Sequence, residues 1–398
     1  MKQPSTLSRF EYIILMSVLV AVDALAIDAI LPALAHMSDY FSLKNDNDRQ
    51  LIVTSIFIGY AFGVMIFGVA SDSFGRKRPI YFGFGIFLIG TVVTVFATDY
   101  SMLLLGRILQ GVGAAGPQII PTAITRDIYK GRDMAQIMSL IMMVFLLVPA
   151  IAPLLGQIVL TVWQWQGIFV FLGLYSIFAL TWFATRLPET LPQEERVPFS
   201  FKQVISSIRV VLGNKRAMKY TIAEGLAFAA IMAYLSTAQQ VFQEHFELGE
   251  RFPLYIGALA FVMMLSSFLN SRLVEGLGMR RLVMTGAISL LVVSSIYLVI
   301  ILLNDTAVPL WSFMIYASIA YFSFGILFGN MHSMAMEQVG HVAGVAASVI
   351  GSVSTLMATM IGAFIGSFYN DSITPIVLGF ALLMLPIIYI TYTDEVMS

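Results

Sequence analysis

The sequence predicts an all-α membrane protein with twelve transmembrane helices, arranged as two pseudo-symmetric six-helix bundles. Three observations lead to this prediction. Of the 398 residues, 59% are hydrophobic and only 11% are charged, whereas about 25% of the residues in an average soluble protein are charged. The chain also contains twelve long apolar runs, and one loop pattern occurs at equivalent places in its two halves.

The composition excludes several classes of protein. A soluble enzyme of this length needs a larger charged surface, a secreted disulfide scaffold needs cysteine, and a disordered chain is far less hydrophobic. The net charge of −1 leaves no basic face for nucleic acid. We therefore expect the protein to contact membrane lipid and no nucleic acid.

The twelve apolar runs are long enough to cross a bilayer, which takes about 20 mostly apolar residues in a helix. They are too long for transmembrane strands and do not alternate with a period of two. The first run is too long for a signal peptide, so we expect it to be retained. The runs lie near residues 11–36, 50–70, 80–97, 102–124, 135–160, 165–186, 217–244, 252–274, 281–303, 309–333, 342–368 and 373–393.

Lysine and arginine are distributed unequally between the loops. Twelve spans place both termini on the same side of the membrane. The loops on the other side hold only Lys44, Arg49 and Arg251, and Arg107 falls inside a span, so 18 of the 22 basic residues lie on the side of the termini. Basic loops stay in the cytoplasm. The sequence therefore predicts that both termini are cytoplasmic.

The longest connection on that side divides the chain into three parts. We expect residues 1–190 to form one bundle, residues 191–216 a cytoplasmic linker, and residues 217–398 the second bundle. Between Phe201 and Arg216 the linker interleaves apolar residues with basic ones at helical spacing, which predicts an amphipathic helix at the membrane surface. A plain linker and a regulatory segment fit this pattern equally well.

Equivalent loops in the two halves share one pattern. After the second run, Asp72 stands three residues before Gly75, and the basic pair of Arg76 and Lys77 follows; the pattern recurs at residues 275–281, after the eighth run. Glycine permits a tight turn, and an acid at a helix end can pair with a basic side chain across a gate. Such symmetry is typical of transporters built from repeated bundles. We expect these four residues to act in gating.

Three segments carry a resemblance to a known family. Residues 68–79 resemble the signature loop of the major facilitator superfamily, except that Ser73 stands where the family usually has arginine. Residues 105–115 are similar to its fourth-helix motif, in which arginine and glutamine precede Gly-x-Gly-Ala-Ala. Residues 149–157 resemble its fifth-helix antiporter motif, with alanine and glutamine in place of two glycines.

The end of the first run, residues 26–34, and the pair of Arg126 and Asp127 look like the Bcr/CflA drug-resistance branch of the drug:proton antiporters. This resemblance implies the major facilitator fold and a monomeric efflux transporter of the bacterial inner membrane. It implies export of small amphipathic or cationic compounds by alternating access. No cofactor is expected, because the proton gradient drives transport. The implied partners are a small-molecule substrate, protons and membrane lipid.

Three other functions fit parts of the sequence. An exporter dedicated to one metabolite, such as a siderophore or a sugar, shares all of these features. A proton-coupled nutrient importer shares the fold but needs a more polar cavity. A membrane-embedded enzyme needs a catalytic cluster, and the sequence contains no Walker loop, no HExxH motif and no metal-ligand spacing beyond a loose pair of His332 and His341. We therefore expect no enzyme activity and no metal site.

Few ionisable residues lie deep in the predicted spans: Asp23 and Asp28 in the first, Arg107 in the outer part of the fourth and Glu224 about two turns into the seventh. Charges at such depth are costly and usually functional, although each could instead belong to a structural ion pair. We expect Asp28 to carry the proton and attract the substrate, with Arg107 as its ion-pair or water-linked partner. Asp23 or Glu224 would supply a second site.

Polar and aromatic residues within the spans are candidates for the binding cavity, beside Asp28 itself. Those residues are Tyr60, Gln118, Tyr234, Gln239 and Gln240.

The fifth run carries a predicted hinge. Pro149 and Pro153 each remove an intrahelical hydrogen bond, and Gly156 permits close approach of a neighbouring helix. A bendable seam of this kind would suit gating by rocking of the two halves. Ordinary packing of membrane helices explains the same residues equally well.

Overall fold

A computed structural model of the protein describes residues 7–196, 201–304, 308–337, 339 and 343–396. Within these residues every regular element is helical, and twelve helices are long and apolar enough to cross a membrane. The predicted all-α fold with twelve spans is confirmed.

The spans follow the predicted runs, with ends that differ by a few residues. The first span combines α1 (Arg9–Asp28), η1 (Leu31–Ala33) and α2 (Leu34–Tyr40). The next five are α3 (Gln50–Phe74), which is preceded by η2 (Asp46–Arg49), α4 (Lys77–Val95), α5 (Tyr100–Ile128), α6 (Gly131–Val162) and α7 (Gln166–Arg186). The last six are α9 (Lys215–Gln239) with η4 (Gln240–His245), α10 (Phe252–Leu277), α11 (Met279–Leu303), α12 (Leu310–Glu337), α13 (Ala343–Gly366) and α14 (Thr374–Val396).

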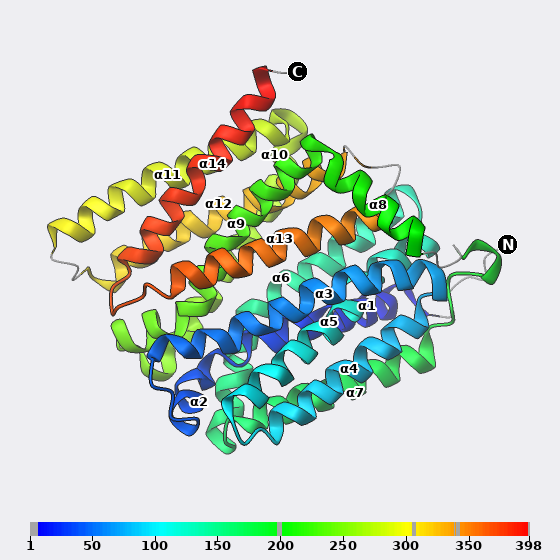
Figure 1. Ribbon diagram of the computed structural model, residues 1–398, viewed down its shortest axis with the longest axis horizontal. Helices are drawn as coiled ribbons and strands as arrows, with labels where there is room; N and C mark the ends of the chain where they lie inside the picture. Colours follow the sequence, from blue (N-terminus) through cyan, green and yellow to red (C-terminus); the bar gives the residue numbers. More distant parts are fainter. Residues whose placement is uncertain (1–6, 197–200, 305–307, 338, 340–342, 397–398) are drawn as a thin grey trace.

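The helices associate in two groups. α1 and α3–α7 pack against one another, α9–α14 do the same, and the groups meet mainly where α3 contacts α13 and α6 contacts α10. Both termini lie at the same end of the bundle (Figure 1). We call the end that carries Arg9, Arg76 and Arg280 the terminal face, and the end that carries Arg49 and Glu244 the opposite face. The domain boundaries near residues 190 and 217 stay a prediction.

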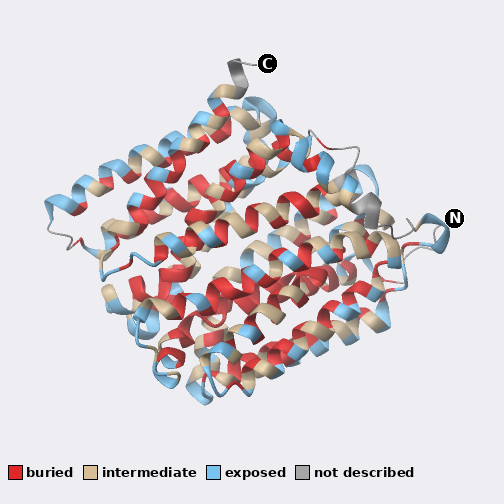
Figure 2. Cartoon of the chain, viewed as in Figure 1, coloured by how far each residue is buried: buried red, intermediate tan, exposed pale blue. Residues whose placement is uncertain are grey.

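Burial follows the position of each helix in the bundle. The helices that begin the two groups, α1 and α9, belong to the most buried spans. Figure 2 shows buried residues through the middle of the bundle and exposed ones on the outer sides of peripheral helices such as α4, α7 and α11. Large apolar side chains such as Phe82, Leu174 and Ile296 are exposed there. Lipid tails are as apolar as these side chains, so they suit a bilayer.

Both central helices lose regular α-helical geometry toward the opposite face. α1 ends at Asp28, and the chain continues through a 3-10 turn that contains Pro32. α9 gives way at Gln240 to a π-helical segment. Proline lacks the N–H that would continue the helix, and interrupted helices at membrane depth are typical of transporter binding sites. Pro32 lies within the first predicted run and Gln240 within the seventh, and the sequence did not predict an interruption at either place.

The predicted linker contains α8 (Phe201–Gly213), which packs against α9 and α13. Val211 is buried, whereas Val210 and Leu212 are exposed. A helix therefore occupies the expected place, and its location at the membrane surface stays a prediction. Residues 197–200 of the linker lie outside the described residues.

Gly156 on α6 lies against the backbone of the first span. A Cβ atom at this position would overlap the carbonyl oxygen of Ala29. Replacing Gly156 with alanine should therefore push α6 away from α1 and destabilise the protein by about 1–3 kcal/mol. The measurement is the thermal unfolding temperature of the purified protein.

Gly85→Ala on α4 is the matched control, because a Cβ at Gly85 meets nothing within 4 Å. We expect this variant to unfold at the wild-type temperature or slightly above it, since alanine favours a helix over glycine. Equal unfolding temperatures for Gly156→Ala and wild type would contradict the close contact between α6 and Ala29.

Candidate functional site

Three of the predicted charges lie together in the first group of helices. Asp23 and Asp28 come from α1 and Arg107 from α5, and all three are buried. Removing charges from water is expensive unless each finds a partner. The partners of these three residues therefore decide what the site can do.

Arg107 is held by oxygen atoms from three helices. It donates to the carbonyl oxygen of Ala26 on α1 (2.9 Å), to that of Ile52 on α3 (3.1 Å), and to the side chain of Gln110 on α5 (2.8 Å). Gln110 in turn donates to the hydroxyl of Thr91 on α4 (2.9 Å). The guanidinium thus ties α1, α3 and α5 together at the depth of the two aspartates.

The electrostatic partner of Arg107 is Asp23. Asp28 and Arg107 form no direct ion pair, so that part of the expectation is wrong, and a water link between them stays a prediction. The reason is helical geometry: five residues correspond to about 140° of rotation. When Asp23 faces Arg107, Asp28 points to a different side of α1.

Neither aspartate is satisfied by hydrogen bonds. No donor among the described residues reaches the carboxylate of Asp23 or Asp28, and Asp23 Oδ1 is buried without a partner. Asp28 has Asp23 as its charged neighbour, which is a like charge. Of the two carboxylates, Asp28 is therefore the one that lacks a cation.

Asp28 faces the second group of helices. It interacts electrostatically with Tyr234 on α9 and Tyr321 on α12. The two tyrosine rings pack edge to face, with centroids 5.0 Å apart. The sequence prediction included Tyr234 and missed Tyr321, because nothing in the sequence distinguishes Tyr321 from the other tyrosines within the spans.

Tyr60 and Gln118 lie on the first-group side of the same region. Tyr60 donates to the Gln118 side chain (2.8 Å) and interacts electrostatically with Asp23. The structure therefore gathers four of the predicted binding residues, namely Asp28, Tyr60, Gln118 and Tyr234, around the seam between the two groups.

Gln239 and Gln240 lie elsewhere, at the contact between the two groups on the opposite face. Gln240 accepts a hydrogen bond from Gln50 (2.8 Å) and donates one to Asn47 (2.9 Å). Gln239 donates to Glu244 (3.1 Å). We therefore propose that these two glutamines act in closing the opposite face, rather than in binding substrate.

An ion pair between Arg49 and Glu244 joins the groups at the same place. Its two contacts measure 2.5 and 2.7 Å, and the arginine side chain is buried. A bidentate pair of this kind is directional and strong. We call Arg49, Asn47, Gln50, Gln240 and Glu244 the opposite-face lock. The sequence missed it because Arg49 and Glu244 stand in different halves of the chain.

Replacing Glu244 with glutamine should open the opposite face more often. A hydrogen bond to a charged group contributes about 1.5–3 kcal/mol, so the open population should rise about tenfold or more. Because the chain has no cysteine, a single Thr54→Cys label can report this opening. Thr54 is buried on α3, one turn beyond Gln50. The measurement is its rate of maleimide labelling in membranes.

The charge-swapped variant, Arg49→Glu with Glu244→Arg, serves as the control. It restores an ion pair and should return the labelling rate of the cysteine toward the rate measured with Thr54→Cys alone. A labelling rate that is insensitive to Glu244→Gln would contradict a role for this pair in closing the opposite face.

On the terminal face, Arg76 joins the ends of two helices. It donates to Asp72 on α3 (2.7 Å), to Ser71 (2.8 Å), and to Asp127 at the end of α5 (2.8 Å). Burial disfavours its charged form, but the hydrogen bonds to Asp127 and Asp72 outweigh this effect and raise the pKa of Arg76. Arg76 therefore stays charged and fixes α3 to α5.

The loop before α4 is held by Glu189, which sequence reasoning missed. Gly75 has a positive φ of 87°, which glycine adopts without strain. Glu189 then accepts hydrogen bonds from the backbone N–H groups of Arg76 (2.9 Å) and Lys77 (3.1 Å), at the N-terminal end of α4. The Lys77 ammonium donates to the carbonyl oxygen of Leu187 (2.7 Å). The predicted gating residues thus anchor the end of α7 to the loop.

Asp72 also reaches the second group of helices. Its carboxylate lies against Gly344 near the start of α13, where a Cβ atom would come within 2.9 Å of Asp72 Oδ2. One turn away, Gly68 lies against the hydroxyl of Ser348. The groups are therefore in contact near the terminal face as well as at the opposite-face lock.

Glu224 does not join the three central charges. It lies on α9 and contacts the imidazole of His332 on α12, with Oε1 and Nδ1 3.0 Å apart. The sequence did not predict this partner. No group of three or more potential metal ligands occurs among the described residues.

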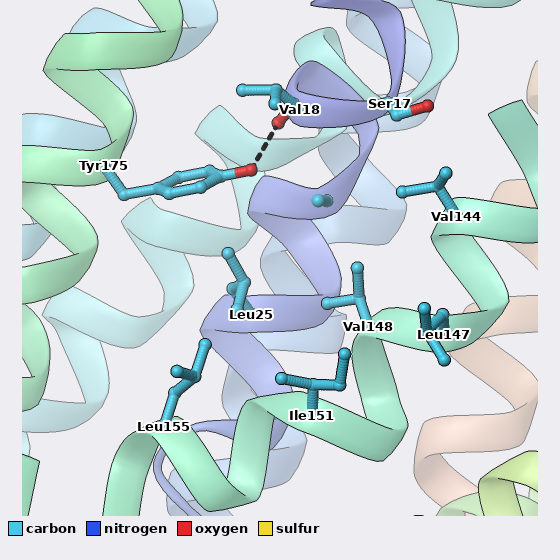
Figure 3. A pocket seen from close by; sticks show the side chains of 10 residues that line it. Ser17, Val18, Leu25, Val144, Leu147, Val148, Ile151, Leu155 and Tyr175 are labelled. Atoms are coloured by element: carbon cyan, nitrogen blue, oxygen red, sulfur yellow. Dashed lines mark hydrogen bonds between the residues drawn. The ribbon is translucent and has the colours of Figure 1, made fainter. Parts of the chain in front are cut away.

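A separate apolar cavity of about 210 Å³ lies between α1, α6 and α7. Figure 3 shows its walls, which include Leu25, Val148 and Leu155, and the hydrogen bond from Tyr175 to the carbonyl oxygen of Val18 (3.0 Å). Its lining carries no charged side chain. We therefore do not assign a charged ligand to this cavity.

Comparisons with known proteins agree with this architecture. A family model described as the Major Facilitator Superfamily matches residues 16–367. The chain is 25% identical to YdgK, an uncharacterised MFS-type transporter of Bacillus subtilis, over 86% of this chain and 85% of that protein. It is 24% identical to a bicyclomycin resistance protein homologue of Haemophilus influenzae, over 85% and 84%. Multidrug resistance protein D of Escherichia coli is 26% identical over 56% and 55%.

Two solved structures share the fold across nearly the whole chain. The xylose transporter XylE of E. coli, in a partially occluded inward-open conformation, gives a TM-score of 0.74 at 12% identity and covers 96% of both chains. The human organic anion transporter MFSD10 gives a TM-score of 0.71 at 15% identity, with coverage of 97% and 100%. At such identities the likeness concerns the fold alone.

Proposed function

Since the chain belongs to the Major Facilitator Superfamily, we propose that it is a proton-coupled efflux transporter that exports small amphipathic or cationic compounds. Membership of this family makes the chain a membrane transporter of small molecules and not an enzyme. The relatives named for bicyclomycin and multidrug resistance support export as the direction. The Bcr/CflA drug-resistance branch is part of the same proposal.

One observation carries the proposal: Asp28 is a buried carboxylate at a helix break, and no described residue gives it a hydrogen bond or a cationic partner. Burying such a charge costs several kcal/mol or more. The cost is relieved when the carboxylate takes up a proton or when a cationic group of the substrate lies beside it. These two events exclude each other, and this competition is what proton antiport requires.

The surrounding residues have distinct roles in this scheme. Arg107 offsets the charge of Asp23 electrostatically, without a hydrogen bond, and holds α1, α3 and α5 together. Tyr234 and Tyr321 present aromatic surface to a cation near Asp28, since ring faces attract positive charge. Tyr60, with its partner Gln118, lies on the side of the first group.

Alternating access requires the contacts at the two faces to break in turn. The opposite-face lock would open to release substrate, while the contact of Asp72 with Gly344 holds the terminal face. In the other half of the transport cycle, the contact between Asp72 and Gly344 would open instead. Pro149 and Pro153 are candidate hinges, because α6 lies on the boundary where the two groups meet.

The orientation is part of the proposal. The excess of basic residues on the terminal face supports a cytoplasmic location for that face. The opposite face then lies outside, and the protein resides in the inner membrane of a bacterium. Both groups of helices that would enclose the transport pathway belong to one chain, so we propose that the monomer is the transporting unit.

The proposal is tested in bacteria that lack their own efflux pumps. Cells that express the protein should accumulate less of a fluorescent lipophilic cation, such as ethidium, than cells with the empty vector. Adding a protonophore should remove the difference. Accumulation that is equal with and without the protein, for ethidium and for a panel of uncharged amphipathic dyes, would contradict multidrug export.

A further inference from the structure

Glu224 and His332 form a buried pair outside the central site. Glu224 is 2% exposed, and its Oε1 lies 3.0 Å from Nδ1 of His332. Its second oxygen, Oε2, is buried and has no hydrogen-bond partner among the described residues. The imidazole side chain, by contrast, is 40% exposed. The pair therefore joins a buried carboxylate that lacks a donor to a base that reaches the surface of the protein.

Three phenylalanine rings separate this pair from the central site. Phe228, one turn beyond Glu224 on α9, packs against Phe328, one turn before His332 on α12, with centroids 5.6 Å apart. Phe57 of α3 packs against Phe228 at 6.0 Å and belongs to the other group of helices. α9 runs away from the terminal face and α12 runs toward it (Figure 1). The pair therefore lies on the terminal-face side of the three rings.

The central site lies on the other side of the rings. Tyr234 follows Phe228 along α9, and Tyr321 precedes Phe328 along α12, so both tyrosines lie nearer the opposite face. Asp28, which interacts with these tyrosines, is there too. The three rings thus divide the titratable residues into two sets. Glu224 and His332 lie toward the terminal face, and Asp28 and the two tyrosines lie toward the opposite face.

Two basic residues of the neighbouring helices have partners of their own. On α10, Arg272 lies over the ring of Phe268, 4.7 Å from its centroid. On α11, Arg280 donates to the carbonyl oxygens of Thr391 and Tyr392. The electrostatic partner of His332 is Glu224.

We infer that Glu224 and His332 form a second proton-binding site, which exchanges protons with solvent on the terminal face. Nδ1 faces Glu224, so Nε2 is the ring nitrogen left to take a proton from water. When a proton binds there, the Nδ1 proton can pass to Oε1. One proton enters: an Nε2–H bond forms, the Nδ1–H bond breaks, an Oε1–H bond forms, and the charge of the pair goes from −1 to 0. This site goes beyond the proposed function, because it binds protons whatever the substrate is.

A purely structural ion pair would look different. In such a pair both carboxylate oxygens have donors and both side chains are withdrawn from water. Here Oε2 has no donor among the described residues and the imidazole is accessible. A group that takes up and releases protons needs such access to water.

The test is a pH titration of the histidine side chains by NMR. The full-length protein is labelled with ¹³C in its imidazole rings and held in lipid nanodiscs, and the chain has only 4 histidines. The His332 signal is the one lost in His332→Gln. In wild type this signal should titrate with pH. In Glu224→Gln the imidazolium loses its counter-ion, so the histidine should hold its proton less tightly. The midpoint of the His332 titration should then fall by about one pH unit or more.

Two variants control the experiment. Glu275→Gln removes an exposed carboxylate near the C-terminal end of α10 and should leave the midpoint of the His332 titration unchanged. Glu224→Asp keeps the charge and should retain most of the wild-type behaviour, which separates loss of charge from misfolding. An His332 signal that does not titrate in wild type, or a midpoint that is equal in wild type and Glu224→Gln, would overturn the inference. Neither outcome depends on the substrate, so failure here is distinct from failure of the export proposal.

Discussion

Asp28→Asn should abolish energised efflux, and cells that express this variant should accumulate ethidium to the level of cells without the protein. Asparagine is close to aspartate in size, but it can neither take up a proton nor carry a negative charge. The competition between proton and cation at this position is then lost. The measurement is steady-state accumulation of the dye in cells with equal amounts of protein in the membrane.

Asp39→Asn is the matched control for this variant. Asp39 lies on α2 in the same span but is exposed, so its neutralisation should leave efflux intact. Asp28→Glu keeps the charge on a longer side chain and should retain partial efflux. Full efflux by Asp28→Asn would remove Asp28 from the mechanism and direct attention to Asp23.

Arg107→Met should destabilise the protein by about 3–5 kcal/mol, because hydrogen bonds to a buried charged group contribute about 1.5–3 kcal/mol each and the charge of Asp23 loses its compensating cation. The variant removes hydrogen bonds to Ala26, Ile52 and Gln110 and leaves Asp23 without its cation. Thermal unfolding of the purified protein measures the loss. Efflux should be lost as well, since Arg107 sets the position of α1.

A second substitution identifies the source of this loss. If the uncompensated charge of Asp23 dominates, the combination of Asp23→Asn with Arg107→Met should recover part of the unfolding temperature. Arg9→Met is the control: Arg9 pairs with Asp133 at the surface, and exposed ion pairs contribute about 0–1 kcal/mol. Unfolding of Arg107→Met at the wild-type temperature would contradict the role of Arg107 in joining α1, α3 and α5.

The sequence predicted what depends on hydropathy and local pattern. The twelve spans follow from runs of apolar residues, and the turn at Gly75 follows from its motif. Hydropathy does not report which way a side chain points around its helix. For this reason the depth of Asp28 and Arg107 suggested a pair, whereas rotation around α1 brings Asp23 to the arginine instead.

Contacts between distant parts of the chain could not be predicted in this way. Arg49 and Glu244 look like ordinary loop charges until the two groups of helices are brought together. His332 stands alone in an apolar helix, and only the packing of α12 on α9 gives it Glu224 as a partner. The break after Asp28 was also missed, because Pro32 lies within an unbroken apolar run.

The most direct test of the account follows two fluxes at once in proteoliposomes with an imposed proton gradient. A dye reports protons inside the vesicles, and an electrode selective for a lipophilic cation reports the cation. For wild type, the account predicts that protons and cation move in opposite directions and in proportion, and that both movements disappear in Asp28→Asn. Proton-coupled cation movement that is undiminished in Asp28→Asn, or cation movement in wild type without protons, would contradict it.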